Sequence, residues 1–78
     1  MAQFELYGSA GCQYTAEMRD WLEWRRQEFV EFDVEADLAA RERMRALTGG
    51  QCTVPVLVEG EKVIQIGWQG RGCVIAGN

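Results

Sequence analysis

One cysteine, at the junction between an alternating apolar run and a helix-like segment, constrains this chain most. The run Phe4-Glu5-Leu6-Tyr7 is followed by the small residues Gly8-Ser9-Ala10-Gly11 and then by Cys12. This order predicts a strand, a loop, a cysteine and a helix. A cysteine at a helix start lies near unpaired backbone N–H groups and the positive end of the helix dipole. That position favours the thiolate, which is the form that attacks disulfides.

The length and composition predict one small folded domain over residues 1–78, with 47% hydrophobic residues and a net charge of −4. The negative charge argues against nucleic acid and anionic membranes as partners. No apolar run approaches the roughly 20 residues of a membrane-spanning helix. Three cysteines without any histidine fit reactive thiols in a reducing compartment and exclude Cys-His catalysis. We expect a cytoplasmic monomer with no metal site.

Hydrophobic periodicity predicts the remaining elements. Apolar residues at helical spacing predict a first helix from Gln13 to about Arg26, with Tyr14, Met18, Trp21 and Leu22 on its apolar stripe. Strict alternation then predicts a strand over 29–34, with Val30, Phe32 and Val34 on one face. Because a helix separates these two strands, we expect them to be parallel.

Cap and turn residues predict the second half of the chain. A helix is expected over 37–47, with Asp37 as its N-cap and Thr48-Gly49-Gly50 as its stop. Runs at 54–58 and 62–66 flank Glu59-Gly60-Glu61, which predicts an antiparallel hairpin. The glycine-rich tail, residues 67–78, has no helical periodicity and is not assigned a helix.

The order strand, C-x-x-T at a helix start, strand, helix, T-V-P and hairpin resembles a small glutaredoxin of the thioredoxin fold, over about residues 3–68. Two motifs are most similar to short glutaredoxin-like proteins, some of which carry selenocysteine at the nucleophile. These motifs are Asp33-Val34-Glu35-Ala36-Asp37 and the segment from Thr48-Gly49-Gly50 through Val58. The resemblance implies an α/β, β-α-β-α-β-β fold with a four-stranded mixed sheet and a shortened or missing C-terminal helix. It also implies a nucleophile at Cys12 and a cis peptide at Val54-Pro55.

This chain departs from the family pattern at several positions. Gln13 and Thr15 stand where the family has proline and a second cysteine, so the usual resolving thiol is missing. Ser9 and Cys52 stand where the family often has basic residues that bind glutathione. The resemblance therefore implies a weakened hold on glutathione. The glycine pair that follows the hairpin is reduced to Gly67-Trp68-Gln69-Gly70.

We predict a glutaredoxin-like thiol–disulfide oxidoreductase in which Cys12 attacks a disulfide and forms a mixed disulfide. Cys52 is the expected resolving thiol, because the family geometry would bring it near Cys12; Cys73 and external glutathione are the alternatives. Oxidation should then join Cys12 to Cys52 and leave Cys73 free. The partners are protein disulfides or glutathione-type thiols, with no resident cofactor and glutathione as a possible cosubstrate. The alternative function is an iron–sulfur carrier dimer ligated through Cys12.

The other predicted site residues would bind substrate. A cis-proline bend exposes the N–H and C=O of Val54, which can pair with a peptide-like substrate as a short added strand. Thr15 either hydrogen-bonds the thiolate or is a simple first-turn residue, and Tyr14 either lines the groove or belongs to the core. Trp21, Trp24 and Trp68 are expected to pack, and Trp68 alternatively covers a sheet face that a shortened third helix leaves bare. The predicted substrate-binding residues are Gly11, Gln13, Tyr14, Thr15, Thr53, Val54, Pro55, Gly67 and Trp68.

Overall fold

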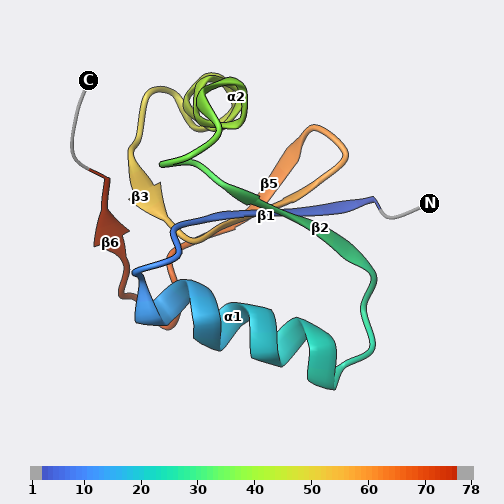
Figure 1. Ribbon diagram of the computed structural model, residues 1–78. Coiled ribbons are helices and arrows are strands. Elements are labelled where there is room, and N and C mark those ends of the chain that lie inside the picture. Colours follow the sequence, from blue (N-terminus) through green and yellow to red (C-terminus); the bar gives the residue numbers. More distant parts are fainter. Residues whose placement is uncertain (1–2, 76–78) are drawn as a thin grey trace.

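Two helices lie on opposite faces of a mixed sheet in the computed structural model, which describes residues 3–75 (Figure 1). The predicted β-α-β-α-β-β order is confirmed, with two further short strands, one just before Pro55 and one in the tail. The elements are β1 (Phe4–Gly8), α1 (Gln13–Trp24), β2 (Phe29–Asp33), α2 (Leu38–Thr48), β3 (Thr53–Val54), β4 (Val56–Glu59), β5 (Lys62–Ile66) and β6 (Cys73–Val74).

The main sheet has the expected four strands, which lie in the order β2-β1-β4-β5. Strand β1 is parallel to β2 and antiparallel to β4, and β4 pairs antiparallel with β5. The strand expected over 54–58 is divided at Pro55, which has no N–H to donate to a ladder. The peptide Val54-Pro55 is cis, as the resemblance implied. Strand β3 therefore leaves the main sheet and pairs with β6 in a separate two-stranded sheet.

Side chains on the two sheet faces form two apolar clusters, because successive residues of a strand point to opposite faces. Leu6 and Leu57 pack with Met18 and Leu22 of α1. Tyr7, Val56 and Val58 pack on the other face with Ala40 and Met44 of α2. Val30 was expected to share the buried face of its strand with Phe32 and Val34, but its side chain is 47% exposed on the edge strand β2.

Helix α1 buries Met18 and Leu22, as predicted, and also Thr15. Tyr14 and Trp21, the other residues of the predicted stripe, are half-buried. Trp24 was expected to pack but is 81% exposed. The helix ends at Trp24, two residues before the expected boundary.

Helix α2 has the predicted caps. The Asp37 carboxylate accepts a hydrogen bond from the Ala40 N–H at 3.1 Å, and Gly49 ends the helix with a φ of 74°. This left-handed conformation suits glycine at the residue that follows a helix. The caps therefore place the start of β3 at a defined distance from the end of α2.

The Tyr7 hydroxyl lies on the α2 face of the sheet, between two charged side chains. The Tyr7 hydroxyl donates to the Glu5 carboxylate at 2.6 Å and accepts from the Arg43 guanidinium at 2.8 Å. Burial, followed by the effect of Glu5, raises the pKa of Tyr7 to about 12. Tyr7 therefore stays neutral and keeps its donor proton at neutral pH.

The tail reverses direction at a two-residue turn after β5. The Trp68 N–H donates to the Arg71 carbonyl at 2.6 Å, and the Arg71 N–H donates back at 2.9 Å. The central residues Gln69 and Gly70 have φ values of 53° and 79°. Positive φ at both positions matches the twist of a tight hairpin, and it returns the chain alongside β3 (Figure 1).

The tail residue Trp68 covers part of the sheet face beside α1. This is one of the two alternatives that the sequence offered for Trp68. Its ring lies 5.6 Å from that of Trp21, and the Arg25 guanidinium lies 4.8 Å from the Trp21 ring centroid. A cavity of about 170 Å³ remains beside the Trp21 ring. Neither helix within residues 3–75 is long and apolar enough to cross a membrane.

Replacing the two tryptophans of α1 separately tests this packing. We expect Trp21→Ala to lower the free energy of unfolding by about 2 kcal/mol, since it removes the contacts with Trp68 and Arg25. The matched control Trp24→Ala, at an exposed position, should change it by less than about 0.5 kcal/mol. Urea unfolding followed by circular dichroism measures both. Equal losses in the two variants would contradict the assigned packing.

Candidate active site

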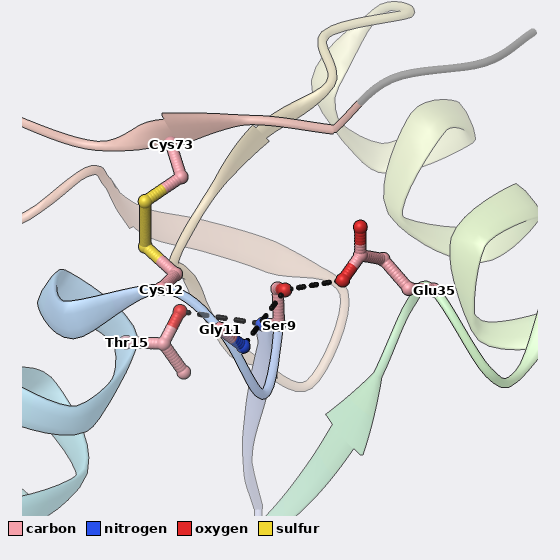
Figure 2. The surroundings of a disulfide bond; sticks show 6 residues. All are labelled: Ser9, Gly11, Cys12, Thr15, Glu35 and Cys73. Atoms are coloured by element: carbon pink, nitrogen blue, oxygen red, sulfur yellow. Dashed lines mark hydrogen bonds between the residues drawn. A yellow bond between two sulfur atoms is a disulfide. The ribbon is translucent and has the colours of Figure 1, made fainter.

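Cys12 and Cys73 form a disulfide between the start of α1 and strand β6 (Figure 2). Cys12 is the N-cap residue of α1 and is 3% exposed. The Cα atoms of the two cysteines are 6.0 Å apart, a usual separation for a disulfide. The predicted helix-start position of Cys12 is confirmed, although its side chain makes no capping hydrogen bond to the first helical turn.

The expected Cys12–Cys52 pairing is wrong in this structure. Cys52 is the free cysteine, and its sulfur lies 4.0 Å from the Gly50 carbonyl. The physical reason is the register of the small sheet, in which Cys73 lies directly opposite Val54. Cys52 precedes Val54 by two residues, about 7 Å further along an extended chain. The tail therefore brings Cys73, the alternative resolving thiol, to Cys12.

Ser9 holds the loop that carries Cys12. Its hydroxyl donates to the Glu35 carboxylate at 2.5 Å and accepts from the Gly11 N–H at 3.3 Å, while its carbonyl accepts from the Cys12 N–H at 3.1 Å (Figure 2). The loop is thereby connected to the acidic turn that follows β2. In the sequence, Ser9 stood out only as a lost glutathione-binding residue, and its contact with Glu35 was not predicted. The acidic motif 33–37, placed where the second strand ends, was the available signal.

Thr15 lies beneath the same loop and is fully buried. Its hydroxyl accepts a hydrogen bond from the Ser9 N–H at 3.4 Å (Figure 2). A Cβ atom added at Gly8 would collide with the Thr15 side chain. Glycine at position 8 therefore allows α1 to approach the end of β1. A hydrogen bond from Thr15 to a Cys12 thiolate stays a prediction for the reduced protein.

The predicted substrate-binding residues fall into two groups. Val54 and Pro55 are buried near Cys12, and half-buried Tyr14 packs against the same cluster. The Gly67 N–H donates to the Pro55 carbonyl at 2.7 Å, which fixes the start of the tail beside the bend. Trp68 instead belongs to the cluster on the α1 side of the sheet. Of the remaining residues, Gly11 and Gln13 are exposed and Thr53 is half-buried.

A cavity of about 350 Å³ lies beside the loop but contains none of the predicted site residues. Arg19 on α1 donates two hydrogen bonds, both 2.7 Å, to the Glu31 carboxylate on β2. The hydrogen bond that Arg19 donates to Glu31 raises the pKa of Arg19, so the guanidinium stays charged. Over residues 3–75, no three His, Cys, Asp or Glu side chains gather where they could hold a metal ion. The cavity lining is Gly8, Ser9, Ala10, Arg19, Glu31 and Asp33.

The glutaredoxin family model matches residues 4–64, and the chain belongs to the glutaredoxin family. This family and fold support a role of the thiol–disulfide oxidoreductase type. The chain's relation to selenocysteine-containing members stays a prediction. Among curated proteins, none matches the sequence significantly.

Two solved structures are similar to this one. A mutant of the thioredoxin-like protein BC3987 has a TM-score of 0.77 and 28% identity, over 88% of this chain and 86% of its own. The glutaredoxin grx-1 from Archaeoglobus fulgidus has a TM-score of 0.73 and 22% identity, over 88% of this chain and 78% of its own. Because the identity to grx-1 is only 22%, that similarity shows the fold alone. The thioredoxin-like α/β fold expected from the sequence is confirmed.

Two glycines of the Cys12 loop provide a matched test of how the loop is packed. We expect Gly8→Ala to lower the free energy of unfolding by about 1–3 kcal/mol, because the added methyl group collides with Thr15. Gly11→Ala, where no atom lies within 4 Å of the added Cβ, should change it by less than about 0.5 kcal/mol. Thermal and urea unfolding measure both variants. If Gly8→Ala proves as stable as Gly11→Ala, α1 does not approach β1 as described.

Proposed function

We propose that this chain is a thiol–disulfide oxidoreductase in which Cys12 is the nucleophile and Cys73 is the resolving thiol. The observation that carries the proposal is the Cys12–Cys73 disulfide at the N-terminus of α1. Two features support the assignment of roles. Cys12 lies where helix N–H groups stabilise a thiolate, whereas Cys73 lies on a two-residue strand that can move away.

The reaction has two exchange steps. The Cys12 thiolate attacks one sulfur of a substrate disulfide, and the second substrate sulfur leaves as a thiolate that takes up a proton from water. The Cys73 thiol then gives its proton to solvent and attacks the Cys12 sulfur. The Cys12–Cys73 bond forms, and the bond to the remaining substrate sulfur breaks. The substrate disulfide is reduced to two thiols, and the protein dithiol is oxidised. An external thiol reductant restores the dithiol by the reverse exchange.

The substrates in this proposal are protein disulfides or glutathione-type disulfides, presented at the main-chain groups of Val54. The residues around the Cys12 loop favour a substrate without negative charge. Ser9, at the position of the family's frequent basic residue, is held by the Glu35 carboxylate and supplies no positive charge. The protein would act as a cytoplasmic monomer. The iron–sulfur alternative has no observation of its own in its favour, since the Cys12 sulfur is bonded to Cys73.

Separate replacement of the two candidate resolving thiols tests the assignment. We expect Cys73→Ser to accumulate a mixed disulfide at Cys12 and to lose at least about tenfold in turnover of a small disulfide. The reason is that an intramolecular thiol acts at a high effective concentration. Cys52→Ser should cycle at the parent rate, because Cys52 lies outside the disulfide. Peptide mapping of the quenched reaction and a coupled turnover assay measure the two effects.

The converse result would reject this assignment. If Cys52→Ser accumulates the mixed disulfide while Cys73→Ser turns over normally, Cys52 is the resolving thiol and the disulfide seen here is not part of the cycle. If both variants cycle normally, an external thiol resolves the intermediate.

The nucleophile is tested by alkylation of the reduced Cys73→Ser protein, which keeps only Cys12 and Cys52. We expect iodoacetamide at pH 7 to modify Cys12 several times faster than Cys52, because the helix start favours the Cys12 thiolate. Mass spectrometry of peptides at successive times gives both rates. Faster modification of Cys52 would show that Cys12 is not the activated thiol.

A further inference from the structure

The tail occupies the edge at which the proposed function would place a substrate. Strand β6 pairs antiparallel with β3, with Cys73 opposite Val54 and Val74 opposite Thr53. The Ile75 N–H also donates to the Cys52 carbonyl at 2.8 Å, and the Ile75 side chain is buried. The edge is therefore covered by an extended segment whose cysteine is bonded to Cys12 (Figure 2). A substrate captured as a mixed disulfide would need these same main-chain groups and the same sulfur position.

The residue before Cys73 approaches β3 too closely to carry a side chain. A Cβ atom added at Gly72 would lie 2.6 Å from the Val54 carbonyl oxygen and 2.8 Å from the Thr53 methyl carbon. The carbonyl belongs to the main chain beside Pro55 and cannot rotate away as a side chain could. In contrast, the Val74 side chain is 78% exposed. At this edge, the residue before the cysteine has no room for a Cβ atom, whereas the residue after the cysteine can carry a side chain.

We propose that Gly72-Cys73-Val74 is a built-in substrate, and that the Thr53–Val54 edge selects cysteines whose preceding residue has no Cβ. The proposal rests on the oxidoreductase function above and names its substrate class. The group that the edge would recognise is an N-acylated cysteine in which an unbranched CH₂ lies next to the acyl carbonyl. A glycine–cysteine segment of an extended protein strand has this group, and so does γ-glutamyl-cysteine, in which the CH₂ is the Cγ of the glutamyl residue.

One consequence concerns resolution. Substrate and tail cannot occupy the edge together, so the segment Gly72-Cys73-Val74 must leave before Cys12 meets a disulfide. The tail then returns by displacing the substrate strand as the Cys73 thiolate attacks the Cys12 sulfur. The Cys12–Cys73 bond forms, and the substrate sulfur leaves as a thiolate that is protonated by water. Return of the tail thus couples resolution to product release.

The first experiment measures selectivity in the full-length Cys73→Ser protein, where the mixed disulfide at Cys12 persists. The probes are the symmetric disulfides of acetyl-Gly-Cys-Val-amide and acetyl-Ala-Cys-Val-amide, and glutathione disulfide. We expect the Gly peptide to react with Cys12 at least about tenfold faster than the Ala peptide, because the alanine methyl collides with Val54. Acid-quenched mass spectrometry gives the rates. A glutathione rate above that of the Gly peptide would identify γ-glutamyl-cysteine as the preferred source of the chemistry, and a lower rate the protein segment.

Equal rates for the Gly and Ala peptides would overturn the selectivity. Hydroxyethyl disulfide, which has no residue before its sulfur, separates this result from failure of the oxidoreductase function. If neither the peptide disulfides nor hydroxyethyl disulfide reacts with Cys12, the proposed function is wrong and the substrate inference falls with it. If hydroxyethyl disulfide reacts while the peptides do not differ, only the substrate inference is wrong.

The second experiment tests whether a Cβ atom at position 72 of the chain itself collides with the Thr53–Val54 edge. In a defined mixture of reduced and oxidised dithiothreitol, Gly72→Ala should shift the Cys12–Cys73 equilibrium toward the dithiol by at least about tenfold. The matched tail variant Val74→Ala, at an exposed side chain, should shift it by less than about twofold. Circular dichroism checks that both variants are folded. If the Gly72→Ala protein closes its disulfide as readily as the parent, the proposal that the tail is a built-in substrate is wrong.

Discussion

The antiparallel pairing of β6 with β3 is the interaction on which the site depends. It involves only two residues on each strand, yet it decides which thiol meets Cys12. The pairing exists because Pro55 interrupts the ladder and releases β3 from the main sheet. The turn at Gln69-Gly70 then reverses the tail. A strand this short has a low cost of opening, which suits an element that must leave and return during a catalytic cycle.

Cys12, the proposed nucleophile, is positioned by the packing of its loop more than by hydrogen bonds of its own side chain. Thr15 fills the space beneath the loop because position 8 has no side chain, and Ser9 ties the loop to the acidic turn at Glu35. These contacts come from β1, α1 and the turn that follows β2. They hold the start of α1 at the carboxyl end of β1. The same arrangement places the Glu35 carboxylate beside Ser9, at the position where the resemblance implied a basic residue.

The residues after β5 also cover part of the sheet. Trp68 packs with Trp21 beside α1, and Arg25 packs over the Trp21 ring. The cover is incomplete, because a cavity remains beside Leu22 and Leu57, and Ile64 is 43% exposed. The residues after β5 therefore have two tasks. The first part of the tail shields the sheet, and the last part reaches the active site.

Local sequence patterns determined the elements of the sheet and helices, the caps of α2 and the position of Cys12 at a helix start. These features depend on periodicity, on capping residues and on neighbours within a few positions. The cis peptide at Pro55 was reached through the family resemblance. The pairing of Cys12 with Cys73, the contact from Ser9 to Glu35 and the exposure of Trp24 were decided only by the tertiary structure. Each depends on which distant segments come together. In particular, Cys12 and Cys73 have a sequence separation of 61, and no local signal favours Cys73 over Cys52.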